Sequence, residues 1–264
     1  MPPEAISPNI EETEKITADV DRYITFVGYP RSGHSLVGSL MDAHPSIVIA
    51  HELDALRMVE EGATKLQVWH AILDNSNEFT ETGRKWQEYT YDVPGQWNGR
   101  CENLKVIGDK KGGRTTIRFG EHPHLIETLK KTMEVPCYFV HVVRNPFDNI
   151  TTMSLRGGTP LAQSIQDYFW RCDAIIRIKP FIDEKNWIDV RHEDVVSDSK
   201  KEVARLCEFA GQIPTQEYLD ACASIVFPSP KKTRQGGDWT PALIELVETK
   251  MKNYYQLEGY SFTS

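Results

Sequence analysis

Tyr23-Ile-Thr-Phe-Val-Gly-Tyr-Pro-Arg-Ser-Gly-His-Ser35 is the segment from which the fold of this chain can be inferred. Its first six residues are apolar apart from Thr25, which is typical of a buried strand. Gly28 and Pro30 end that strand. From His34 to Asp42 the apolar residues recur at helical spacing. The segment therefore predicts a strand, a glycine-containing loop and a helix in direct succession.

The loop in this segment is suited to binding a phosphate group. Its spacing matches GxxxxGK[ST], except that His34 stands in the lysine position. Backbone N–H groups of such a loop and the positive end of the following helix dipole favour an anion. The lysine that reaches the β- and γ-phosphates of a nucleotide is missing, whereas Arg31 supplies a cation earlier in the loop. We expect one 5′-phosphate to be bound by Arg31, Ser32, Gly33, His34 and Ser35.

Short apolar segments alternate with helical ones along the rest of the chain. Further strands are expected at Ser46–Ala50, Leu104–Gly108, Pro136–Val143 and Trp187–Val190. Residues 52–92 lack strand character and include a helical pattern at Glu78–Tyr89. The alternation predicts an α/β fold: a P-loop-like three-layer sandwich with a mainly parallel central sheet flanked by helices. In such folds, ligands lie beyond the carboxyl ends of the strands.

The composition is that of a globular protein. Of 264 residues, 40% are hydrophobic and 26% are charged. Residues 1–20, rich in proline and acidic residues, are expected to be a disordered tail before a single domain at 21–264. The chain lacks a basic start followed by an apolar core, and it lacks a long apolar run. We therefore expect a cytoplasmic protein without a membrane partner.

Charge and cysteine content exclude several classes of site. The five cysteines are at least 15 residues apart, so neither a zinc site nor a disulfide framework is expected, and we expect no metal. A net charge of −8 argues against a nucleic-acid partner. The cations are nevertheless clustered, with six Lys and Arg between Arg100 and Arg118. The oligomeric state stays open.

The first loop and the helix end Leu40-Met-Asp-Ala-His-Pro45 resemble the 5′-phosphosulfate loop of the sulfotransferase superfamily. These enzymes use 3′-phosphoadenosine 5′-phosphosulfate (PAPS) as co-substrate. The loop is most similar to that of the tyrosylprotein and bacterial branch, because cytosolic relatives usually have Lys at Arg31 and Thr-Thr-Trp after the glycine. The resemblance implies transfer of a sulfuryl group from PAPS to an acceptor hydroxyl, which we expect to belong to a small molecule.

A second segment, beginning at Arg144-Asn-Pro, resembles the family motif for the 3′-phosphate. In that motif an Arg and a hydroxyl residue lie eight positions apart, as Arg144 and Thr152 do here. Arg156 matches a further arginine of the tyrosylprotein branch, and on a helix it shares a face with Thr152. His192 stands where the family usually has Tyr. It either approaches the adenosine or is a structural histidine.

The segment Lys231–Trp239 resembles the basic, glycine-containing loop of the family, which ends in Gly-Asp-Trp. The residues expected to close over the 3′-phosphate are Arg234 and the adjacent Gln235 and Gly236. The Arg-Lys-Gly start of the common version of this loop is absent.

Sulfuryl transfer needs a base for the acceptor and cations for the oxygens of the donor. Arg31 can stabilise the departing 5′-phosphate, and Lys110 matches a family lysine at the transferred group, with Lys111 as the alternative. Glu52 is the expected base, because its spacing of 21 from Arg31 matches the catalytic glutamate of the tyrosylprotein branch. The rival bases are His51 and His122.

Two other functions remain in competition. A divergent nucleotide kinase would need a lysine in the first loop, and His34 argues against it. An inactive nucleotide-binding module is opposed by the joint presence of Arg31, Glu52, Lys110 and Arg144. The segment 69–97 can form the wall of an acceptor pocket or the core of a helical subdomain, and we favour the core. Its aromatic residues are Trp69, Phe79, Trp86, Tyr89, Tyr91 and Trp97.

Overall fold

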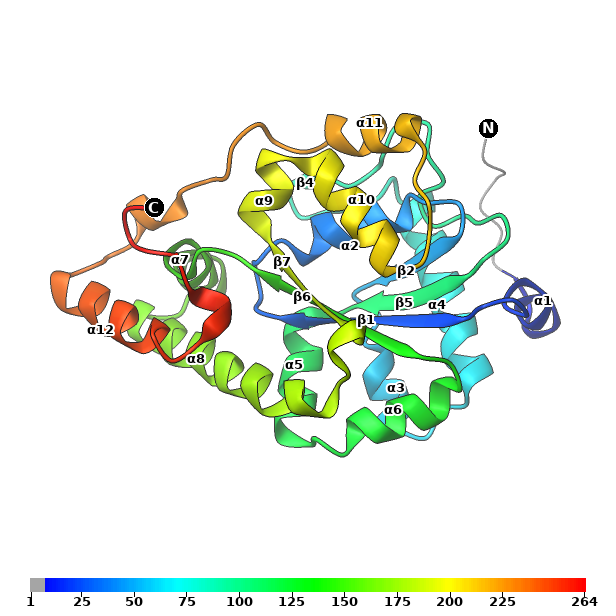
Figure 1. Ribbon diagram of the computed structural model, residues 1–264, viewed down its shortest axis with the longest axis horizontal. Coiled ribbons are helices and arrows are strands. Elements are labelled where there is room, and N and C mark those ends of the chain that lie inside the picture. Colours follow the sequence, from blue (N-terminus) through cyan, green and yellow to red (C-terminus); the bar gives the residue numbers. More distant parts are fainter. Residues whose placement is uncertain (1–7) are drawn as a thin grey trace.

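A computed structural model describes residues 8–264, and its centre is a five-stranded parallel sheet (Figure 1). The strand order is β2-β5-β1-β6-β7. The strands are β1 (Arg22–Gly28), β2 (Ile47–His51), β5 (Val106–Lys110), β6 (Cys137–Val143) and β7 (Trp187–Arg191). The expected α/β fold with a parallel sheet is therefore confirmed.

The central strand β1 is also the point where the chain changes direction across the sheet. Tyr23 of β1 pairs with Ile107 of β5 on one side and with Cys137 of β6 on the other. The chain first builds β2 and β5 to one side of β1 and then β6 and β7 to the other. The loops after β1 and β6 therefore diverge and leave a crevice at the carboxyl edge, where ligands of such folds bind.

Helices cover both faces of the sheet (Figure 1). No helix within residues 8–264 is both long and apolar enough to cross a membrane. On one face lie α2 (His34–Asp42), α9 (His192–Ser197), α10 (Ser199–Phe209) and α11 (Gln216–Ser224). On the other lie α3 (Ala55–Glu60), α4 (Lys65–Glu81), α5 (Gly112–Glu121) and α6 (Leu125–Met133). A third cluster is formed by α7 (Pro146–Gly157), α8 (Leu161–Ile178) and α12 (Pro241–Met251).

Alternate side chains of β1 belong to the hydrophobic cores on the two faces of the sheet. Ile24 and Phe26 are fully buried with α2, whereas Tyr23 and Val27 face the opposite side and pack near Phe119 of α5. Burial on both faces explains why the strand is an almost continuous apolar run. This packing holds the loop after β1 between two layers.

The segment between α4 and β5 differs from the expected helix at Glu78–Tyr89. Helix α4 ends at Glu81, and an antiparallel hairpin follows, formed by β3 (Lys85–Trp86) and β4 (Tyr89–Thr90). Gly83 and Arg84 have positive φ angles of 74° and 51°, which a helix cannot continue through. The expectation that residues 52–92 contain no strand was therefore wrong.

Residues 8–20 are also more ordered than expected for a tail. Helix α1 (Ile10–Ile16) begins with a capping box between Asn9 and Glu12. Thr13 Oγ1 lies 3.0 Å from His70 Nδ1, which joins α1 to α4. Residues 1–7 of the expected tail lie outside the described residues, and a single domain at 21–264 stays a prediction.

Candidate active site

A cavity of about 720 Å³ opens at the carboxyl edge of the sheet. Its lining comes from the loops after four strands, from α7 and α9, and from the β3–β4 hairpin. Among the lining residues are Arg31, Glu52, Arg144, Thr152 and His192. The lining residues lie up to 203 positions apart, from Pro30 to Thr233, and each segment that resembles a family motif contributes at least one of them.

The phosphate loop is held in a conformation that requires glycine at position 33. Gly33 has φ 104°, and a Cβ placed on it would lie 2.6 Å from His192 Nδ1. Arg31 also has a positive φ of 71°. Helix α2 begins directly after Gly33, and the first amides of a helix have no intrahelical acceptor. This end of α2 is therefore suited to an anion.

The His34 ring faces the protein interior, whereas the lysine at this position of nucleotide-binding loops reaches the phosphates. Its Nε2 lies 3.0 Å from the carbonyl oxygen of Val27, and the side chain is buried. Burial lowers the pKa of His34 to about 4, so the ring is neutral at pH 7. A Cβ on Gly112 would lie only 2.4 Å from this ring. The His34 ring thus packs between the loop and α5, although His34 also contributes to the cavity lining, and its expected role as a phosphate ligand stays a prediction.

Glu52 and two lysines form the charged centre of the cavity. Glu52 Oε1 accepts from Lys110 Nζ at 2.6 Å, and Oε2 lies 2.9 Å from Lys111 Nζ. Lys110 also donates to Ser35 Oγ at 3.1 Å, which links the centre to the phosphate loop. Burial opposes ionisation of Glu52, but the two lysines together lower its pKa to about 2. The fold thus brings Glu52, Lys110 and Lys111 together, and their catalytic roles stay predictions.

The two rival bases occupy different environments. The His51 ring stacks on Phe79 with centroids 4.1 Å apart and contacts Trp86 edge-on. Burial and the charge of Lys110 lower the pKa of His51 to about 3, so the ring is neutral and lies behind the residues that line the cavity. His122 is exposed and caps the carboxyl end of α5, whereas the cavity lies at the amino end. Ten helical residues separate the two ends by about 15 Å, so His122 lies outside the residues that line the cavity.

Arg144 is the centre of the second expected anion site. It is 7% exposed and donates to Thr152 Oγ1 at 3.4 Å and to the carbonyl oxygen of Arg31 at 3.3 Å. Its Nε is buried without a hydrogen-bond partner among the described residues. Thr233 Oγ1 lies 3.0 Å from Thr152 Oγ1, so a third polar side chain belongs to the site. We had not singled out Thr233, although it directly precedes Arg234 in the basic loop.

His192 lies beside this site and against the phosphate loop. Burial and the positive charge of Arg144 lower the pKa of His192 to about 4. Its Nδ1 is buried and, within the described part of the chain, has no hydrogen-bond partner. A neutral ring nitrogen in this position is available to a ligand.

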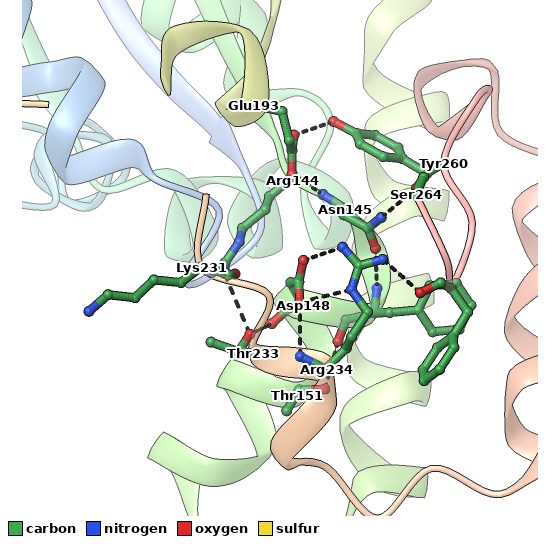
Figure 2. A network of polar contacts seen from close by, with 12 residues as sticks. Arg144, Asn145, Asp148, Thr151, Glu193, Lys231, Thr233, Arg234, Tyr260 and Ser264 are labelled. Carbon is green, nitrogen blue, oxygen red and sulfur yellow. Dashed lines mark hydrogen bonds and ion pairs between the residues drawn. The ribbon is translucent and has the colours of Figure 1, made fainter. Parts of the chain in front are cut away.

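The guanidinium of Arg234 is bound by other parts of the protein, and its expected closure over the 3′-phosphate stays a prediction. Figure 2 shows its guanidinium turned toward Asp148, with Nη2 2.5 Å from Oδ2. Its Nη1 donates to the carbonyl oxygens of Ser261 and Phe262 at 2.9 Å each. Arg234 is 5% exposed, and its guanidinium joins α7 to the C-terminal segment.

The remaining residues expected in this loop are placed differently. Gln235 and Gly236 are exposed, and neither is among the described residues that line the cavity. The loop reaches the site through Thr233 and through Lys231, whose carbonyl oxygen accepts from Arg144 at 2.6 Å (Figure 2).

The aromatic residues of segment 69–97 divide into two groups. Trp69 and Phe79 are buried in the core that includes α4. Trp86, Tyr89 and Tyr91 instead line the cavity. Our preference for a core role was therefore wrong for these three. Trp97 lines a separate surface hollow.

Residues 24–216 match a model of the sulfotransferase family. This chain belongs to the sulfotransferase family. The resemblance inferred from the two anion-binding motifs is therefore confirmed at the level of the family. No curated protein matches the chain by sequence.

Solved sulfotransferases share the fold at low sequence identity. The sulfotransferase domain of the Synechococcus PCC 7002 olefin synthase is 17% identical, with 88% of each chain covered and a TM-score of 0.51. Sulfotransferase STF9 from Mycobacterium avium is 13% identical, with 95% of this chain and 80% of that chain covered and a TM-score of 0.53. STF1 from Mycobacterium tuberculosis is 11% identical, with 95% and 81% covered and a TM-score of 0.51.

Proposed function

We propose that this sulfotransferase moves the sulfuryl group of PAPS to a hydroxyl group of a small-molecule acceptor. The observation that carries the proposal is one cavity lined both by the phosphate loop and by Arg144 with Thr152, two groups of donors that we propose as anion sites. A donor with a 5′-phosphosulfate and a 3′-phosphate needs two such sites. Family membership supports sulfuryl transfer over the nucleotide-kinase alternative.

The unpaired polar atoms of the cavity fit this donor. Arg144 Nε is a buried donor without a partner among the described residues, and a phosphate oxygen is a suitable acceptor for it. Thr152 and Thr233 add hydroxyl groups at the same place. The phosphate loop and Arg31 would hold the 5′-phosphate, and the sulfuryl group carried by the donor supplies the electrophile.

Glu52 is the proposed base, and its two lysine partners control its pKa and therefore its strength as a base. While both lysines bind it, Glu52 stays ionised but is a weak base, since its pKa is about 2. Lys110 has a second partner in Ser35, so its ammonium can turn toward an anionic ligand at the loop. Loss of one positive neighbour would raise the pKa of Glu52 and strengthen it as a base. Lys110 would then stabilise negative charge on the transferred group.

Donor specificity tests the proposal. 3′-Phosphoadenosine 5′-phosphate (PAP) should raise the melting temperature more than AMP or Mg-ATP at equal concentration, because only PAP occupies both anion sites. Arg144→Ala should remove most of the difference between PAP and AMP. Arg57→Ala, an exposed arginine on α3, is the matched control and should leave it unchanged. Equal shifts with PAP and AMP would contradict a 3′-phosphate site, and a larger shift with Mg-ATP would favour a kinase.

A further inference from the structure

The tip of the β3–β4 hairpin contacts cations from three separate parts of the donor site. Gln87 Oε1 accepts from Arg31 Nη1 at 2.6 Å. Glu88 forms an ion pair with Arg156. These two arginines come from the phosphate loop and from α7, which are the segments proposed to bind the two phosphates.

The next hairpin residue makes the third of these contacts. Tyr89 accepts a hydrogen bond from Lys231 Nζ at 3.2 Å, and the ammonium also lies 5.3 Å from the centre of its ring. Lys231 belongs to the loop that supplies a carbonyl oxygen to Arg144. Three consecutive hairpin residues therefore span the donor side of the cavity, and we call residues 85–90 the strap.

The strap is firmly attached at its base and weakly held at its tip. At the base, Arg84 is 1% exposed and pairs with Asp42 at 2.6 Å, and its carbonyl oxygen accepts from the Tyr91 amide. At the tip, the paired side chains of Glu88 and Arg156 are 40% and 51% exposed. Exposed ion pairs contribute little to stability, and a hairpin with two-residue strands is marginal alone. The tip can therefore exchange its contacts while the base stays in place.

Glu88 has the charge and the position of a competitor for the donor. Its carboxylate forms an ion pair with the guanidinium of Arg156, and we assign Arg156 to the donor side of the cavity. A phosphate monoester carries about −1.5 to −2 charge near pH 7, against −1 for a carboxylate, and so binds an arginine more strongly. The two anions also repel each other at close range. Donor binding therefore favours release of Glu88.

The strap also lies near the proposed base, and we call this side of the cavity the acceptor side because the base must face the acceptor hydroxyl. Trp86 belongs to β3 and is 40% exposed. Its ring contacts that of His51, with the ring centroids 5.0 Å apart. His51 directly precedes the proposed base Glu52. A shift of the tip would therefore move an aromatic wall close to the reacting groups.

Resting on the proposed function, we propose that the strap is an internal occupant of the donor site that the donor must displace. Glu88 stands in for a donor phosphate at Arg156 until the donor arrives. Displacement carries Trp86 to a new position, so that donor binding reshapes the acceptor wall before the acceptor binds.

Calorimetric titration with PAP tests the competition. Glu88→Gln keeps the shape of the side chain and removes its charge, so it should bind PAP about three- to tenfold more tightly than the parent. Glu81→Gln is the matched control, because it makes the same charge change at an exposed position outside the cavity lining. Its affinity for PAP should equal that of the parent. AMP, which lacks the 3′-phosphate, should bind Glu88→Gln and the parent equally.

Tryptophan fluorescence tests the movement. PAP should change the emission of the parent, and Trp86→Phe should lose most of that change while still binding PAP. If Glu88→Gln binds PAP no better than the parent, the strap is not a competitor, although the proposed function stands. Tighter binding without a Trp86 signal would reject the coupling to the acceptor wall. If PAP binds neither protein, the proposed function and the strap are both rejected.

Discussion

The carboxylate of Glu52 lies between two lysine ammonium groups, and this arrangement defines the most direct mutational test. Glu52→Gln removes the basic oxygen while keeping the shape of the side chain. The turnover number should fall by about 10²–10⁴, the usual contribution of a general base, while affinity for PAP stays near that of the parent. Steady-state kinetics together with PAP titration would measure both effects.

Arg31→Ala provides the comparison for this variant. Arg31 is proposed to face the 5′-phosphate, so its loss should lower turnover and weaken PAP binding together. A Glu52→Gln enzyme within about threefold of the parent rate would refute the assignment of the base. His51 would then be the next residue to replace, despite the low pKa that burial gives it.

At the level of elements, the phosphate loop depends on how closely α5 approaches it. Gly112 begins α5 and leaves room for the buried His34 ring. Gly112→Ala should push α5 from the loop and destabilise the protein by about 1–3 kcal/mol, as overpacking does. PAP affinity should fall as well, because the loop changes shape. Urea unfolding and PAP titration would measure the two effects.

Gly236→Ala is the control for this change. A Cβ on Gly236 would meet no described atom within 4 Å, so the substitution should alter stability by less than about 0.5 kcal/mol. It should also leave PAP binding unchanged, since Gly236 lies on the exposed side of its loop. A Gly112→Ala protein as stable as Gly236→Ala would contradict the close packing of α5 on the loop.

For the whole molecule, basic side chains that line the cavity can neutralise the negative charge of the proposed donor. The cations Arg31, Lys111, Arg144 and Arg156 contribute to its lining, and Lys110 lies directly beneath Glu52. We therefore expect turnover to persist in excess EDTA, because these side chains can neutralise the donor without a metal ion. An activity assay before and after chelation measures this. Complete loss of activity that Mg²⁺ restores would contradict the prediction.

The parts of the fold that were predictable are those controlled by local sequence. The helix at His34–Asp42 and the parallel strands follow from apolar spacing, because side-chain period and burial are coupled along each segment. The second anion motif was also recognisable, since Arg144 directly follows β6 and Thr152 lies on α7, which begins two residues later. The sequence alone therefore pointed to Glu52 and Lys110, which the structure places in contact.

Tertiary contacts decided what the sequence pattern could not. Arg234 forms an ion pair with Asp148, which is 86 residues away in the sequence. The His34 ring packs against Gly112 of α5. Both looked like ligands because the charge or polarity of a side chain does not reveal its partner. The hairpin at 85–90 escaped detection because its strands have only two residues each, too few for a periodic pattern. Local patterns specify strands and helices, whereas the partner of each polar group depends on segments that only folding brings together.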